Sequence, residues 1–165
     1  MKRGTPVVTR ELLTIELVPR TAWYKNVRSN VAPEEWDRLR RIISERANYI
    51  CEVCGGRGRQ WPVECHEVFA YDDERRVQKL VRLVVLCPAC HQVKHIGLAG
   101  ARGHMREATA HMARVNNWSL EDARHYIEGC FEIWSRRSCH QWTLDISYLE
   151  QFGVKAEATA PAAPK

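Results

Sequence analysis

Two segments in the middle of the chain have the pattern of β-strands. The residues from Trp61 to Val68 suit a strand, and those from Leu80 to Leu86 form an apolar run rich in β-branched side chains. The stretch between them, residues 71–76, is polar and has the composition of a turn. The pattern therefore predicts an antiparallel hairpin.

Helical patterns flank this hairpin on both sides. Pro33 is followed by Glu34 and Glu35, which is typical of a helix start, because proline needs no amide partner there and acids favour the positive end of the helix dipole. One apolar face follows, made of Trp36, Leu39, Ile42 and Ile43. Pro88 can open a second, short helix directly after the hairpin.

The chain beyond Gly103 is also predicted to be helical. Ser119 and Asp122 have the spacing of a helix cap, and apolar residues then recur at helical intervals. We expect these residues to belong to the core: Leu120, Ala123, Ile127, Phe131 and Trp134. Cys130 lies on the same face, whereas Cys139 is expected to be a free thiol.

The two ends of the chain are predicted to be extended. The first thirty or so residues alternate apolar and polar, as an arm that packs on the domain would, and residues 142–147 suggest a short strand that pairs with this arm. Residues 155–165 are rich in Ala and Pro, which predicts a disordered tail. The order of elements indicates an α+β fold with one domain over residues 1–154 and its core at about 49–98.

Charge and length narrow the class of protein. A chain of 165 residues can bury one substantial core, and its 25 basic against 20 acidic residues give a charge of +5, the sign expected for a polyanion partner. No apolar run reaches the length of a membrane span, so we expect no membrane association. A cytoplasmic location follows as an expectation, and a reducing compartment disfavours disulfides.

Four cysteines occur as two pairs with the same spacing. Cys51 and Cys54 are separated by two residues, as are Cys87 and Cys90. This spacing lets one tight turn present two sulfurs to one metal, and two such pairs complete the tetrahedral shell that structural zinc prefers. The sequence therefore predicts a structural Zn²⁺ site.

Three histidines accompany the cysteine pairs. His66 lies in the first predicted strand, and its ordinary pKa suits a general base. His91 and His95 are four residues apart, so they share one face of the helix and could hold a divalent metal, with Cys65 or a carboxylate as third ligand. An alternative is that His91 or His95 is a spare ligand of the structural zinc. The remaining histidines are expected at the surface or as caps: His104, His111, His125 and His140.

The segment from Cys51 to His95 resembles the HNH endonuclease family, the ββα-metal nucleases, in the form clamped by two CxxC pairs. The resemblance implies that His66, in Glu64-Cys65-His66-Glu67, is the general base and that His91, directly after the second pair, binds the catalytic metal. His95 matches a further metal histidine of colicin-type members. The implied metal is Mg²⁺, Mn²⁺, Ni²⁺ or Zn²⁺.

Two positions depart from the pattern of that family. Cys65 stands where His or Asp is frequent, and a thiol favours zinc or other transition metals over magnesium. Arg82 stands where the family has its middle Asn, nine residues before the metal histidine. Arg82 would either contact phosphate in the active site or mark a weakened enzyme.

Basic residues surround the motif and are expected to hold nucleic acid: Arg57, Arg59, Arg75, Arg76, Lys79, Lys94 and Arg102. The sequence therefore predicts a metal-dependent endonuclease that hydrolyses DNA, with RNA as the other candidate substrate. The alternative is a catalytically weak or inactive zinc module that binds nucleic acid or a protein partner. The sequence leaves open a monomer or a homodimer.

Overall fold

The computed structural model describes residues 12–23, 26–58 and 62–155. Its elements, with η for a 3₁₀-helix, follow one another as η1 (Arg20–Ala22), α1 (Pro33–Arg46), β1 (Glu64–Asp72), β2 (Val77–Leu86), α2 (Pro88–Lys94), α3 (Ile96–Ala101), α4 (Met105–Asn116), α5 (Leu120–Arg137), β3 (Thr143–Asp145) and η2 (Ser147–Phe152). Helices and a three-stranded sheet together make a mixed α and β structure, as the sequence predicted. No helix within these ranges is both long and apolar enough to cross a membrane.

The predicted hairpin is present, and its strands are longer than expected. β1 pairs with β2 from Glu64 opposite Leu86 to Asp72 opposite Val77, with a bulge after Val68. The turn is shorter than the polar stretch from 71 to 76 that the sequence predicted. The carboxylate of Asp72 accepts hydrogen bonds from the backbone amides of Glu74 and Arg75, which form a tight turn at the end of β1.

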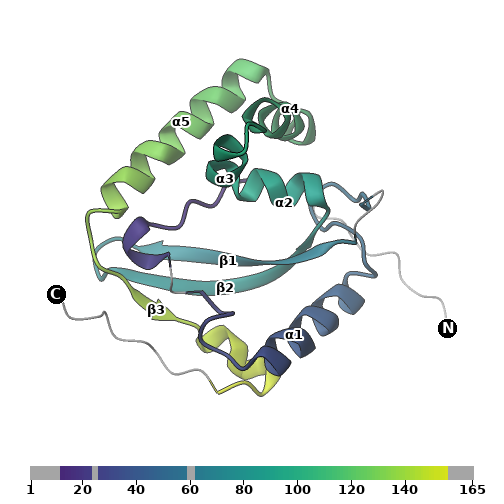
Figure 1. The fold of residues 1–165 in the computed structure, drawn as a ribbon, viewed down its shortest axis with the longest axis vertical. Coiled ribbons are helices and arrows are strands. Elements are labelled where there is room, and N and C mark those ends of the chain that lie inside the picture. Colours follow the sequence, from purple (N-terminus) through teal and green to yellow (C-terminus); the bar gives the residue numbers. More distant parts are fainter. Residues whose placement is uncertain (1–11, 24–25, 59–61, 156–165) are drawn as a thin grey trace.

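The third strand corrects the prediction for the C-terminal region. β3 pairs in parallel with β2, Val77 opposite Thr143, and not with the N-terminal arm. The arm instead has no regular structure over residues 12–19 and passes between the sheet and the upper helices (Figure 1). Its contacts are apolar side chains, such as Leu13 and Ile15, and the backbone hydrogen bond from Glu16 N to Lys94 O.

Each face of the sheet covers its own apolar cluster. On one face, Val84 and Leu86 pack with the arm and the helices α2 to α5, and on the other, Leu83 and Val85 pack with α1 and the C-terminal segment. Figure 1 shows α2 to α5 above the sheet and α1 below it. Side chains alternate along β1, so successive residues belong to different clusters.

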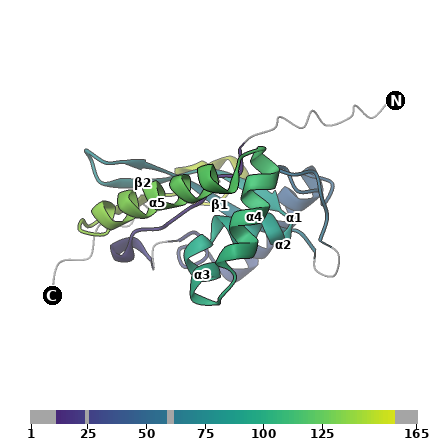
Figure 2. The ribbon, with the colours of Figure 1, turned by 90° about the horizontal axis from the view of Figure 1, so that it is seen from above.

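α5 extends along the hairpin toward its turn, while α4 crosses near α2 (Figure 2). The expected cap is present as a full capping box between Ser119 and Asp122. Ala123 and Ile127 are buried as predicted, but Leu120 is 48% exposed, because it lies in the first turn of α5, ahead of the buried stretch. The predicted tail from residue 156 onward lies outside the described residues.

Candidate metal centre

The four paired cysteines converge on one point. Cys51, Cys54, Cys87 and Cys90 each offer a sulfur within 4.8 Å of the others, and Cys54 Sγ lies 3.6 Å from Cys87 Sγ. Tetrahedral zinc with bonds of about 2.3 Å would set its sulfurs about 3.8 Å apart. The cluster could therefore hold a zinc ion, as the spacing predicted.

The thiols perturb one another strongly. Hydrogen bonds from Cys87 and Cys90 hold the pKa of Cys51 far below its usual range. Burial, together with the charge at Cys51, raises the pKa of Cys54 to about 11. Four sulfurs so close cannot all be thiolates without a cation, whereas a bound metal removes this conflict.

Glu52 joins this cluster to the free edge of β2. Its backbone amide donates to Val85 O at 2.9 Å, and its carboxylate accepts from Val85 N at 2.6 Å. The same carboxylate accepts from Arg82 Nη2 at 2.9 Å. Arg82 therefore pairs with the loop between the first two cysteines.

His111 of α4 contacts the cysteine cluster and is not the surface or capping residue that was predicted. Its Nε2 lies 3.2 Å from Cys90 Sγ, and its Nδ1 lies 2.7 Å from Arg114 Nη2. A guanidinium only donates, so Nδ1 accepts and Nε2 carries the hydrogen that points to the sulfur. Hydrogen bonds of this kind orient metal ligands.

A second cluster is formed by His66, His91 and His95. Each offers a ring nitrogen within 4.8 Å of the other two. His66 is the third residue of β1, on the face covered by α2, and His91 and His95 come from the last turn and the end of α2. The Nε2 atoms of His91 and His95 are 3.1 Å apart.

One carboxylate orients His91, and a second lies near His66. Glu64 Oε2 lies 2.6 Å from His91 Nδ1, so this nitrogen donates and Nε2 keeps a free lone pair. Glu16 Oε1 lies 3.6 Å from His66 Nε2, too far for a good hydrogen bond. Within the described residues His66 Nε2 is therefore buried without a hydrogen-bond partner.

Lys94 completes this buried group and is not on the surface as predicted. It is 5% exposed, and its Nζ lies 2.8 Å from Thr14 Oγ1 and 3.3 Å from Glu16 Oε1. Burial raises the pKa of Glu16, but the interactions with His66 and Lys94 outweigh burial and lower it overall. Glu16 is therefore a carboxylate, held between an ammonium and an imidazole.

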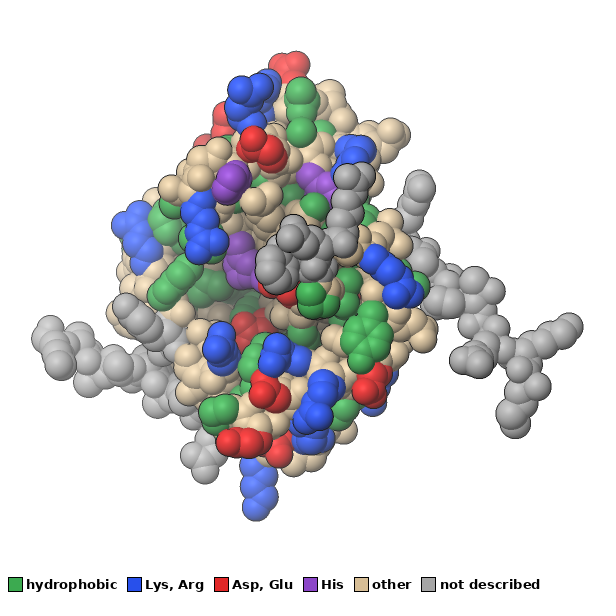
Figure 3. All heavy atoms as spheres, turned by 45° about the vertical axis from the view of Figure 1, so that its right-hand side comes forward, with side chains coloured by type: hydrophobic (Ala, Val, Ile, Leu, Met, Phe, Trp, Pro, Cys, Tyr) green, Lys and Arg blue, Asp and Glu red, His purple; other side chains and the backbone are tan. Residues whose placement is uncertain are grey.

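The surroundings of His91 and His95 favour neutral imidazoles. Burial lowers the pKa of His91, and burial together with the charges of His66 and His91 lowers the pKa of His95 to about 4. Neutral imidazole is the form that binds metal. Figure 3 shows one face of the molecule, with histidine side chains beside a hollow, acidic side chains inside it and Lys and Arg around its rim.

The second cluster fits a metal ion. An unpartnered buried nitrogen, two Nε2 atoms at 3.1 Å and a carboxylate behind one imidazole are what a histidine site needs. Metal–nitrogen bonds of about 2.0–2.1 Å would set two such nitrogens about 3.4 Å apart. Imidazole donors suit zinc, nickel or copper better than magnesium or manganese.

Cys65 does not join this cluster. It packs in the apolar cluster on the opposite face of the sheet from His66, because neighbouring strand residues point in opposite directions. Burial raises the pKa of its thiol to about 12, which disfavours the thiolate that a metal would need. The expectation that Cys65 supplies a ligand is corrected: the third nitrogen near His91 and His95 belongs to His66.

The basic residues expected to hold nucleic acid are dispersed. Arg59 lies outside the described residues, and the others, apart from Lys94, are exposed or half-exposed. Their positions are the loop after Cys54 for Arg57, the hairpin turn and its flanks for Arg75, Arg76 and Lys79, and the end of α3 for Arg102. Those of the hairpin turn lie at the opposite end of β1 from Glu64.

Sequence reasoning missed the residues behind the two clusters. Glu64 carried one signal, because it lies two positions before His66 and therefore on the same face of β1. Glu16 and His111 carried none, since each reaches its partner from a distant segment. No family model, curated protein or solved structure matches this chain.

Proposed function

We propose that this protein is a metal-dependent endonuclease of the HNH type that hydrolyses phosphodiester bonds of DNA. The observation that carries the proposal is the cluster of His66, His91 and His95 on a hairpin followed by a helix, with a four-cysteine cluster at its base. The same residues carry the resemblance of the sequence to the ββα-metal nucleases.

Three histidines would carry the reaction, two as metal ligands and one as the general base. His91 and His95 would hold the metal, since the Nδ1 of His91 is already occupied by Glu64 and its Nε2 lies 3.1 Å from that of His95. The metal would supply Lewis acidity at the phosphate and the leaving 3′ oxygen. The resemblance implies products with 5′-phosphate ends.

His66 would act as the general base. Its ring packs edge to face with those of His91 and His95, at centroid distances of 5.3 and 5.0 Å, and Glu16 Oε1 lies 3.6 Å from its Nε2. A carboxylate beside an imidazole stabilises the imidazolium that forms when the ring takes a proton from water. Lys94 fixes Glu16 in place by a second charge contact.

Cleavage of supercoiled plasmid tests the proposal. We expect nicking or linearisation by the wild type with Ni²⁺ or Zn²⁺ and weaker cleavage with Mn²⁺ or Mg²⁺, because the cluster offers nitrogen donors. His66→Ala should abolish cleavage, and His91→Ala should abolish both cleavage and metal binding. His125→Ala, an exposed histidine of α5, is the matched control and should cleave like the wild type.

Metal content measured on the same variants separates the two roles open to His66. A general base can be removed without loss of the catalytic metal, so His66→Ala should bind it nearly as well as the wild type. Loss of that metal in His66→Ala would assign His66 as the third ligand and contradict its role as base.

The alternative function is a non-catalytic zinc module, and two observations favour it. Arg82 is paired with Glu52, and Lys94 points inward to Glu16, so neither cation is free to hold a phosphate at the histidine cluster. Absence of cleavage with every metal, by protein that still carries its structural zinc, would establish this alternative.

A further inference from the structure

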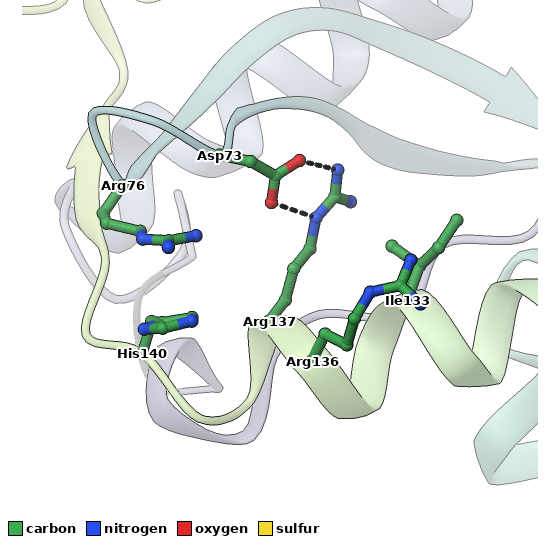
Figure 4. Close-up of a pocket in the computed structure, with 6 residues that line it drawn as sticks. All are labelled: Asp73, Arg76, Ile133, Arg136, Arg137 and His140. Atoms are coloured by element: carbon green, nitrogen blue, oxygen red, sulfur yellow. Dashed lines mark hydrogen bonds and ion pairs between the residues drawn. The ribbon is translucent and has the colours of Figure 1, made fainter.

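An arginine-lined pocket lies where the hairpin turn meets the end of α5. Its cavity of about 410 Å³ is lined by Asp73, Arg76, Ile133, Arg136, Arg137 and His140. Figure 4 shows Arg76 and His140 extending side by side into the opening, and Arg137 rising from α5 to meet Asp73. None of these residues belongs to either metal-binding cluster.

The pocket carries an excess of positive charge. Asp73 is its single carboxylate, and it accepts two hydrogen bonds from Arg137, at 2.9 Å and 2.7 Å. Arg137 first, and then the charges of Arg76 and Arg136, lower the pKa of Asp73. Three guanidinium groups therefore surround one carboxylate, which leaves two positive charges without counting His140.

Two of the three arginines, Arg137 and Arg76, are in place before any ligand arrives. The guanidinium of Arg137 lies over the ring of Tyr71, 4.4 Å from its centroid, while it is fixed by Asp73. Arg76 is anchored by the hydrogen bond from Thr143 N to its carbonyl and lies 5.9 Å from the ring centroid of Trp142. In the described part of the chain no acidic side chain forms an ion pair with Arg76 or Arg136.

A phosphate group matches this arrangement. The planar fork of a guanidinium pairs with phosphate oxygens through two hydrogen bonds, and two unpaired forks offset the charge of a phosphodiester. Ile133 gives the pocket one apolar wall, against which a sugar could pack. The partial negative charge at the end of α5 is offset by Arg136 and Arg137 in its last turn.

The pocket is linked to the histidine cluster along the sheet. A second cavity of about 150 Å³ shares Ile133 and Arg137 with it and includes Glu16, which contacts His66. His66 and Asp73 are seven positions apart in the sequence, mostly within β1, which corresponds to about 23 Å at about 3.3 Å per residue. Duplex DNA covers that distance in about seven base pairs.

We propose that this pocket binds a backbone phosphate of the nucleic acid, about seven base pairs from the phosphate held at the histidine cluster. The inference rests on the proposed function for the choice of ligand. A phosphate in this pocket would give the enzyme a second contact with its substrate, so that the nucleic acid is held at both ends of the hairpin.

Binding to a fluorescent duplex of about 20 base pairs, long enough to span both points, tests the proposal without cleavage when no divalent metal is added. The pocket variant is Arg76→Gln with Arg136→Gln. The control is Arg106→Gln with Arg124→Gln, which removes the same charge from α4 and from α5, at exposed side chains outside the pocket lining. Arg136→Gln alone, at an exposed position, serves if the double variant fails to fold.

We expect the pocket variant to bind the duplex about tenfold more weakly and to reduce the slope of log affinity against log salt by about one or more. The control should change both quantities much less. Equal losses in the two double variants would overturn the proposal, because they would reflect net charge alone. Unchanged binding in the pocket variant would also overturn it.

A titration with inorganic phosphate, monitored through the arginine side-chain NMR signals, distinguishes free phosphate from the phosphate of a nucleic acid as the ligand. Shifts of the pocket arginines with phosphate, in a protein that does not bind the duplex, would overturn the assignment to nucleic acid. Pocket-dependent duplex binding by a protein that cleaves nothing would support this inference while the proposed nuclease activity fails.

Discussion

Glu16 lies beside two residues of the histidine region, Lys94 and His66. Its carboxylate lies 3.3 Å from the buried Lys94 ammonium and 3.6 Å from His66 Nε2. A buried ammonium is stable in the folded state only when it is paired or hydrogen-bonded. The residue that supports the proposed base therefore also stabilises the fold.

Glu16→Gln should destabilise the protein by about 3–5 kcal/mol, because it leaves the Lys94 charge buried without a counter-ion. Lys94→Met added to Glu16→Gln should recover most of that loss, since both charges are then gone. Chemical denaturation of the wild type, the two single variants and the double variant measures the coupling. Additive losses would contradict a direct charge pair.

At the scale of elements, the cysteine cluster joins two segments of the hairpin region. Cys51 and Cys54 follow α1, whereas Cys87 lies between β2 and α2, and Cys90 lies in α2. Glu52 pairs with the edge of β2, and His111 contacts Cys90 from α4. The position of α2, and with it that of His91 and His95, therefore depends on this cluster.

We expect one zinc ion per chain at the four cysteines, and a loss of cooperative unfolding when a chelator removes it. In small zinc modules the binding free energy is about 10–16 kcal/mol and is also folding energy. Metal analysis and thermal unfolding, with and without chelator, check this. Cys139→Ser, an exposed cysteine outside the cluster, is the control. A Cys51→Ser variant that folds and keeps zinc would contradict the assignment.

At the scale of the whole molecule, the C-terminal segment closes the second apolar cluster. Leu144 is 1% exposed in β3 and packs beneath the sheet with the side chains of α1. Leu120, which the helical pattern assigned to the core, is 48% exposed. The two leucines therefore differ in environment although both were apolar positions of a regular pattern.

Leu144→Ala should cost about 2–5 kcal/mol of unfolding free energy, because it removes a buried side chain and leaves a cavity. Leu120→Ala should change it by less than about 0.5 kcal/mol, since most of that side chain already faces water. Urea unfolding of both variants provides the comparison. A similar loss in both would show that Leu120 is covered in solution.

The sequence by itself determined the elements and the ligand pairs that lie close together along the chain. The hairpin, α2 with His91 and His95, and the CxxC pairs follow from strand period, helical spacing and tight turns, which depend only on neighbouring residues. The same local rules predicted the helix starts at Pro33 and Ser119.

Only the tertiary structure decided which distant residues meet. Glu16 reaches His66, His111 reaches Cys90 and β3 pairs with β2 because packing brings these segments together. The directions of the Arg82 and Lys94 side chains depend in the same way on the carboxylates placed beside them. Such contacts join positions far apart in the chain, and no local periodicity encodes them.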